Sequence, residues 1–191
     1  MRNSALLTVQ EHTSSSYAPR TYANALNADL TVAFAVDFTT AGERLTHKAA
    51  QARYHAIPLA GEPIVAARSL YRAMRLHNAR TLNIAGNGIY TLSQVGSWSQ
   101  ESVNQWVFAV LQKVAAHWPL THVRSGGQTG VDIAGVAAAH ALGLDALALL
   151  PRGYRQRHTD KRDREHSQAE IHAQIEHYAK QLVDGGAAVL R

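Results

Sequence analysis

The feature that most constrains this chain is a glycine-rich stretch in its second half, where residues 125–132 read Ser-Gly-Gly-Gln-Thr-Gly-Val-Asp. An apolar run ending at Val123 precedes the stretch, and a run of small residues with helical character begins near Val131. A glycine turn that leads from a strand into a helix exposes backbone N–H groups, and the positive end of the helix dipole points into that turn. The stretch therefore predicts a binding site for an anion, most naturally a phosphate group.

Length and composition are those of an ordinary globular domain. The chain has 191 residues, of which 46% are hydrophobic and 17% are charged. A chain of this length can bury a single sizeable core, so we expect one domain over residues 1–191. The chain contains no cysteine, which excludes disulfides, thiolate metal sites and a cysteine nucleophile.

The same composition bears on location and partners. No apolar run approaches the roughly 20 residues of a membrane span, and residues 1–10 lack the long apolar segment of a signal peptide. We therefore expect a cytoplasmic protein with no membrane partner. The formal net charge of +5 favours an anionic ligand. The sequence leaves open whether the chain forms a homo-oligomer.

Much of the positive charge lies in residues 152–165, where six basic and three acidic residues give a net charge of +3. Two interpretations stay open, namely a solvated surface loop and a basic rim above the anion site. A nucleic-acid surface is a further alternative, but Tyr154 is the only Phe, Tyr or Trp in the segment, and single strands bind on several aromatic side chains.

Strand-like and helix-like segments alternate along the chain. Strands are expected at residues 6–9, 30–36, 54–59, 81–85, 122–124, 146–150 and 187–190. Helices are expected over about 17–28, 43–52, from Pro63, from Ser97 or Ser99 to 118, over 131–142 and over 167–183. This alternation predicts an α/β, Rossmann-like fold, which is an open, mostly parallel sheet with helices on both faces.

Side-chain caps mark the start of three of these helices. Ser97 with Gln100, and Ser167 with Glu170, have the spacing of capping boxes. Thr129 and Asp132 could cap the helix at 131–142.

Polar residues follow three of the predicted strands, at 37–43, 86–90 and 125–132. In an open parallel sheet, ligands bind at the carboxyl ends of the strands near a topological switch point. We therefore expect the three segments to meet in one crevice.

Residues 125–132, together with Leu-Pro-Arg-Gly at 150–153, resemble the phosphate-loop region of the SLOG superfamily. This superfamily of Rossmann-like proteins includes Smf/DprA, the LOG nucleotide hydrolases, the YpsA-like proteins and the molybdenum-cofactor carrier-like proteins. The resemblance is greatest to the YpsA-like and carrier branch, in which the glycine motif usually lies near the amino terminus.

Two further segments resemble the same branch, but in a different order along the chain. Residues 17–24, Tyr-Ala-Pro-Arg-Thr-Tyr-Ala-Asn, with Ala28-Asp29, resemble the Y-x-x-R-T-x-x-N…A-D segment that follows the glycine motif in the carriers. Residues 81–86, Thr-Leu-Asn-Ile-Ala-Gly, resemble the L-N-V-A-G strand near their carboxyl end. The resemblance therefore implies a circularly permuted SLOG domain, in which residues 1 to about 95 supply the family's later part and about 120 to 165 its beginning.

The motif and the resemblance together imply a phosphate-containing ligand, either a nucleotide or a molecule derived from NAD or ADP-ribose, held by a sensor or carrier. Glycines in the loop allow close backbone approach to a phosphate. The residues expected to contact the ligand are Ser125, Gly126, Gly127, Gln128, Thr129, Gly130, Asp132, Arg20, Thr21, Asp37, Thr40, Gly42, Gly86, Asn87 and Gly88.

Several of these residues have a structural alternative. Asp132 could bind the ligand or cap its helix, and Asp37 could hydrogen-bond a ribose or end its strand. Asn87 and Tyr90 could pack on a base or form a structural turn. Arg20 is expected to meet a phosphate or carboxylate group, because the resemblance places it beside the Asp37 strand.

Glu43 supports a second hypothesis, which is hydrolysis of an N-glycosidic bond. LOG-type hydrolases carry a P-G-G-x-G-T-x-x-E loop whose glutamate acts at that bond. Residues 39–46 occupy the corresponding strand end but lack the second glycine and the glutamate spacing. A carboxylate beside a ribose can stabilise oxocarbenium-like charge or activate water, so Glu43 is the candidate catalytic residue. DprA-like nucleic-acid binding is the third hypothesis.

Eleven histidines raise the question of a metal site. No H-E-x-x-H motif occurs, and His172 and His177 are five residues apart, so they do not share a helix face. We expect no metal, and no cofactor other than the nucleotide-derived ligand.

Overall fold

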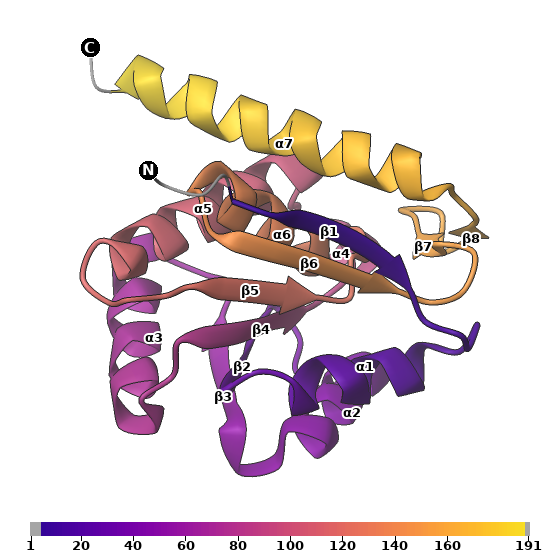
Figure 1. The fold of residues 1–191 in the computed structure, drawn as a ribbon, viewed down its shortest axis with the longest axis horizontal. Helices are drawn as coiled ribbons and strands as arrows, with labels where there is room; N and C mark the ends of the chain where they lie inside the picture. The colour runs from indigo at the N-terminus through magenta and orange to yellow at the C-terminus, as the bar shows by residue number, and fades with distance from the viewer. Residues whose placement is uncertain (1–4, 190–191) are drawn as a thin grey trace.

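A six-stranded sheet organises the fold, and its strands lie in the order β1-β6-β5-β4-β2-β3 (Figure 1). The computed structural model describes the backbone of residues 5–189 and the side chains of residues 5–185. The strands are β1 (Leu7–Glu11), β2 (Leu30–Ala35), β3 (Tyr54–Pro58), β4 (Thr81–Gly86), β5 (His122–Ser125) and β6 (Asp145–Leu150). All five pairings are parallel. The structure therefore confirms the predicted Rossmann-like α/β fold.

Helices cover both faces of the sheet (Figure 1). The first face carries α1 (Tyr17–Leu26) and α2 (Ala41–Ala50), which ends in a short 3₁₀ turn at Gln51–Arg53. The second face carries α3 (Pro63–His77), α5 (Gln100–Ala115) and α6 (Val131–Ala141). Side chains of successive strand residues point to opposite faces, and Arg124 of β5 reaches Asn24 of α1 whereas Ile84 of β4 lies against Gly135 of α6. The helix α7 (Gln168–Val189) packs on α6 and beside β1.

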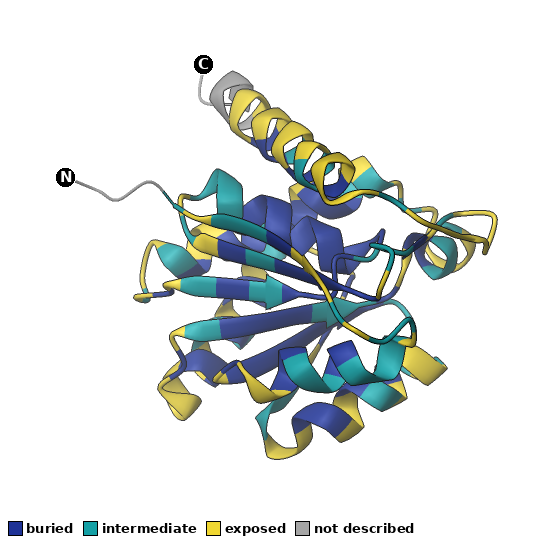
Figure 2. Ribbon diagram, turned by 45° about the vertical axis from the view of Figure 1, so that its right-hand side comes forward, coloured by how far each residue is buried: buried dark blue, intermediate teal, exposed yellow. Residues whose placement is uncertain are grey.

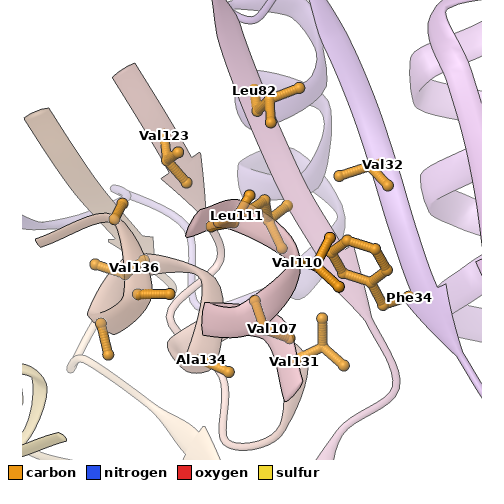
Figure 3. Packing of buried hydrophobic residues seen from close by; sticks show 14 of the residues in the cluster. Val32, Phe34, Leu82, Val107, Val110, Leu111, Val123, Val131, Ala134 and Val136 are labelled. Carbon is orange, nitrogen blue, oxygen red and sulfur yellow. The ribbon is translucent and has the colours of Figure 1, made fainter. Parts of the chain in front are cut away.

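The two faces differ in how much apolar volume they hold. On the second face, side chains of α5 and α6 such as Val110 and Val136 form one apolar cluster with Phe34, Leu82 and Val123 of the sheet (Figure 3). The first face has a small separate cluster built around Ala25, Ala49 and Ala50. Small side chains beneath α1 and α2 leave this face with room that the second face does not have.

The burial pattern explains why the central strands are so apolar. All six residues of β2 are buried, and the inner strands are covered on both faces while the outer surfaces of the helices are exposed (Figure 2). A parallel strand covered on both faces needs apolar residues at nearly every position rather than at alternate ones. The nearly continuous apolar run at 30–36 has this origin.

The sheet has its topological switch point between β2 and β4. The connection that leaves β2 runs through α2 to the edge strand β3, whereas the connection that leaves β4 leads the other way, to β5. Adjacent strands whose connections diverge leave a crevice at their carboxyl ends. The loops that follow β2 and β4 therefore border an opening, and the loop after β5 lies next to them.

The prediction of a carboxyl-terminal strand at 187–190 is wrong, because α7 continues to Val189. Leu190 lies outside the described residues. Buried Ile171, Ile175 and Leu182 anchor this helix along the core. Such tertiary packing outweighs the cost of about 1 kcal/mol for a glycine in a helix. The capping box at its start is confirmed, since Ser167 and Glu170 bond each other's backbone N–H at 2.7 and 3.2 Å.

Two other local predictions are also wrong. The capping box of α5 joins Ser99 to Ser102 rather than Ser97 to Gln100. The helix α6 has Gly130 as its N-cap with no side-chain cap, so neither Thr129 nor Asp132 caps it. The short helix α4 (Ile89–Val95) was not predicted.

Two helical glycines predict opposite effects of alanine. Gly185 has no atom within 4 Å of an added Cβ, so Gly185→Ala should stabilise the protein by up to about 1 kcal/mol. In Gly135→Ala the Cβ would lie 2.7 Å from Ile84 Cγ2, and overpacking should destabilise it by about 1–3 kcal/mol. Urea unfolding measures both changes.

The Ile84→Ala background tests the reason for the second effect. A double-mutant cycle should show a smaller Gly135→Ala penalty there, because most of the clashing side chain is gone. Equal penalties in both backgrounds would contradict the packing explanation.

Candidate functional site

A cavity of about 670 Å³ opens at the carboxyl ends of the central strands. Helices α1 and α2 and the loops after β4 and β5 line it. Twelve of the sixteen predicted site residues line this cavity: Arg20, Thr21, Thr40, Gly42, Glu43, Gly86, Asn87, Gly88, Gly126, Gln128, Thr129 and Asp132. The expected crevice therefore exists, and residues from three strand ends meet in it.

The other four predicted residues support the site from outside the cavity. Ser125 is fully buried and donates from Oγ to the carbonyl of Ile84 at 2.5 Å, which joins β5 to β4. Gly130 is held at both backbone groups by the Gln100 carboxamide, at 2.6 and 2.9 Å. Gly127, with φ at +65°, makes the turn of the loop. Asp37 forms a local turn with Thr39.

Asp37 lies in a local turn at the end of β2. Its Oδ1 accepts from the Thr39 hydroxyl at 2.6 Å and from the Thr39 N–H at 2.7 Å. These two bonds, the hydroxyl one first, lower the pKa of Asp37 below its usual range. Of the two alternatives for Asp37, the geometry matches the strand-ending one.

The glycine loop presents free backbone donors. Within the described part of the chain, no acceptor takes a hydrogen bond from the N–H of Gly126, Gly127 or Thr129. Buried backbone N–H groups nearly always have a partner. Three such donors in one loop beside a cavity make an anion-binding concavity.

An ion pair between Arg20 of α1 and Asp132 of α6 lies directly on this loop. The Arg20 Nη1 and Asp132 Oδ2 atoms are 3.1 Å apart, and both residues are buried. A Cβ on Gly126 would lie 1.4 Å from that Nη1 atom, so only glycine leaves room for the guanidinium. The Arg20 Nε is buried and has no partner among the described residues. Asp132 thus holds Arg20 over the loop.

Charge around this ion pair is balanced within the cavity wall. Burial raises the pKa of Asp132, and the Arg20 guanidinium opposes that effect, as do the N–H groups of Gln128 and Gly86. The pair contributes little net charge, but it keeps a guanidinium desolvated and ready to donate hydrogen bonds.

Glu43 also lies in the cavity wall and is buried. Burial, and then the charges of Asp132 and Asp37, raise the pKa of Glu43 to about 8. Its Oε2 has no partner among the described residues, and its Oε1 lies 3.5 Å from Asn87 Nδ2. At neutral pH this carboxyl is therefore mostly protonated, so it can donate a proton.

Asn87 connects the strand ends at the switch point. Its Oδ1 accepts from the N–H groups of Val36 and Asp37, both at 2.9 Å, and its Nδ2 donates to the Asp37 carbonyl at 2.9 Å. Backbone pairing of Gly88 with Gly130 then joins this loop to the glycine loop. The sequence left open whether Asn87 packs on a base or forms a structural turn, and these hydrogen bonds match the structural turn.

The segment with the basic residues forms a hairpin of β7 (Gln156–Arg157) and β8 (Asp163–Arg164), fixed to the glycine loop. Gln128 donates to the Arg155 carbonyl at 2.6 Å and accepts from the Arg157 N–H at 2.9 Å. The Thr129 hydroxyl donates to the Arg157 carbonyl. These side chains hold the hairpin and are not free for a ligand, whereas the loop's backbone is.

The cavity wall also includes residues that were not among the predicted ligand contacts, such as Tyr17, Asn24, Asn83, Arg157 and Lys161. Asn83 is a buried polar residue in the middle of an apolar strand, and it donates to Thr31 Oγ1 at 3.2 Å. That interruption of the apolar pattern was a readable signal. Residues 152–165 contain six basic residues, and two of them, Arg157 and Lys161, reach the cavity. No local sequence pattern distinguishes these two from the other four.

No group of three or more His, Cys, Asp or Glu side chains is placed to hold a metal ion in residues 5–185. No described helix combines the length and apolar character needed to cross a membrane.

The fold is Rossmann-like, with a cavity at the carboxyl ends of the strands. The chain belongs to the circularly permutated YpsA SLOG family, whose model matches residues 3–107, more than half of the chain. The matched range ends before the glycine loop. The predicted SLOG membership and the permuted order are thereby confirmed.

Other comparisons add little. No curated protein matches the chain. Among solved structures, a candidate alcohol dehydrogenase from Ralstonia eutropha JMP134 has 14% identity and a TM-score of 0.38, over 81% of this chain and 43% of that one. This chain thus spans less than half of that protein's length, and similarity at this level carries no argument about function.

The raised pKa of Glu43 predicts a pH dependence of stability. Between pH 4.5, the ordinary pKa of this carboxyl, and about pH 8, its raised pKa in the folded protein, the folded state binds a proton that the unfolded state has lost. The free energy of unfolding therefore falls as the pH rises through this window. Glu43→Gln removes the titration. From the bottom to the top of this pH window, the free energy of unfolding of the variant should rise by roughly 3–5 kcal/mol relative to that of wild type.

Urea unfolding across that pH range measures the gain. The exposed Glu101→Gln variant serves as a matched control and should show the wild-type profile. Parallel profiles for wild type and Glu43→Gln would contradict a protonated Glu43.

Proposed function

We propose that the protein binds a phosphate-containing small molecule in this cavity, a nucleotide or a ligand derived from NAD or ADP-ribose, and acts as a sensor or carrier. The observation that carries the proposal is the glycine loop, whose free N–H groups lie beside the desolvated guanidinium of Arg20. A phosphate oxygen can accept from both kinds of donor at once. Membership of the SLOG family supports a nucleotide-related ligand.

The cavity also suits the rest of such a ligand. Its volume of about 670 Å³ lies within the range of small-molecule sites. Its wall contains Tyr17 and Tyr90, which provide aromatic surface, and Asn24 and Asn83, which provide carboxamide groups. The wall contains two acidic residues, Glu43, which is mostly protonated, and Asp132, which is paired with Arg20. An anion therefore meets no uncompensated negative charge.

Thermal shift and calorimetry against phosphate, AMP, NAD and ADP-ribose test this proposal. A ligand present at 100 times its Kd should stabilise the protein by about 2.7 kcal/mol. The double variant Arg20→Gln/Asp132→Asn replaces both charges with neutral hydrogen-bonding groups. It should bind at least about tenfold more weakly, because charged hydrogen bonds to phosphate are lost.

Arg80→Gln is the control for that variant. Arg80 is exposed and precedes β4, at the opposite end of the sheet from the cavity, so its loss should leave affinity at the wild-type value. If none of the compounds in the panel stabilises the protein, the proposed function is ruled out.

A second function, cleavage of an N-glycosidic bond, is favoured by the state of Glu43. A carboxyl with a pKa of about 8 in a ligand cavity is suited to proton transfer near neutral pH. In this reaction Glu43 donates its proton to the departing base, water adds to the anomeric carbon, and the Glu43 carboxylate takes up the proton that the water loses.

Incubation with nucleoside monophosphates and with ADP-ribose should then release free base or a ribose phosphate. Glu43→Gln should abolish the release by more than about 100-fold, since general acid–base groups contribute about 10²–10⁴-fold. Unchanged turnover in Glu43→Gln would remove this assignment, while binding could stand alone.

A further inference from the structure

The hairpin at residues 152–165 carries more positive charge than its own carboxylates neutralise. Each of its three acidic residues is paired with an arginine: Arg155 with Glu165 at 3.1 Å, Arg157 with Asp163 at 2.7 Å, and Arg164 with Asp160 at 2.6 Å. The side-chain charges of its other three basic residues, Arg152, Lys161 and Arg162, form no salt bridge within the described residues. The net charge of +3 is therefore located on these three.

Of these three residues, Lys161 alone lines the cavity. Its ammonium lies 4.9 Å from the centre of the Tyr90 ring, which follows the second glycine turn. The other two cations in the cavity wall, Arg20 and Arg157, are each paired with an aspartate. Lys161 is thus the uncompensated positive charge of the described cavity.

The backbone at the hairpin tip directs Lys161 to this place. Lys161 has φ at +66°, a left-handed conformation that favours glycine and is uncommon for other residues. Its N–H donates to the His158 carbonyl at 3.0 Å, which closes the turn. A lysine in a position that suits glycine points to a role for its side chain.

The hairpin is also fixed relative to the glycine loop. Besides the bonds from Gln128 and Thr129, buried Gln156 donates to the Gly127 carbonyl at 2.7 Å. Lys161 and the free N–H groups of the loop are therefore held beside the same cavity.

We propose that the ligand carries a second phosphoryl group and that Lys161 binds it, so the site selects diphosphates over monophosphates. The glycine loop and Arg20 bind one phosphoryl group, and Lys161 meets the other across the cavity mouth. A lysine ammonium suits this role because it is a compact point charge with three donors. The inference rests on the proposed function and names the substrate class of that same site.

Calorimetry with two matched ligand pairs, AMP with ADP and phosphate with pyrophosphate, tests the inference in EDTA at constant ionic strength. Wild type should bind the diphosphate of each pair about tenfold or more tightly, the effect of one charge-assisted contact. In Lys161→Met the affinity ratio should fall towards one. Lys161→Gly should behave in the same way, and it suits the left-handed backbone, so misfolding cannot explain its loss.

Two further variants separate the position of the charge from its presence. Arg162 is next to Lys161 in the chain but does not line the cavity. Arg162→Met should therefore keep the wild-type ratio of diphosphate to monophosphate affinity. Lys161→Arg should retain most of the preference, because it keeps a cation at the hairpin tip.

The outcomes distinguish the inference from the proposed function. If wild type binds AMP or phosphate but shows a ratio near one, or if Lys161→Met and Lys161→Gly keep the wild-type ratio, the inference is overturned and the proposed function stands. If Arg162→Met lowers the ratio as much as Lys161→Met, the preference is a general charge effect and the inference fails. If no compound of either pair binds, both fail.

Discussion

The ion pair between Arg20 and Asp132 is the contact on which the site depends. It joins α1 to the first turn of α6, across 112 positions of the chain, at 3.1 Å. A buried ion pair is weak evidence for stability, since desolvation offsets much of its attraction. Its evident effect is positional, because it fixes a guanidinium above Gly126, where any side chain would displace it. The loop's glycine and the helix's arginine therefore require each other.

The placement of the cavity follows from how the two faces of the sheet are filled. On one face, α5 and α6 pack closely on large apolar side chains of the sheet such as Phe34, Leu82 and Ile84, and that face is closed. On the other face, α1 and α2 meet through alanines, and polar residues such as Asn83 and Asn24 are buried between them and the strands. Divergence of the connections at β2 and β4 opens the same region at the strand ends. Topology and side-chain volume thus favour one location for a ligand.

Sequence reasoning located most of this site because backbone chemistry leaves strong local signals. Glycines at 126, 127 and 130, a strand before them and a helix after them indicate a turn with exposed N–H groups, and the structure has that turn. The roles of individual side chains were harder to predict from the sequence. Gln128 and Thr129 were expected to contact the ligand, but their side chains form hydrogen bonds with backbone groups of the hairpin. Asp132 was expected to cap or bind, but it pairs with a residue more than 100 positions away.

The sequence by itself determined the alternation of strands and helices, the parallel sheet, the permuted family order and the glycine loop, because each depends on local periodicity, on backbone freedom or on short motifs. Only the tertiary structure decided what those elements bring together. Lys161 lines the cavity while Arg162 does not, and Asn87 fastens the end of β2. Glu43 is buried, and burial together with the charges of Asp132 and Asp37 raises its pKa to about 8. Desolvation and partners distant in sequence set these properties, and neither is encoded in the neighbouring residues of the chain.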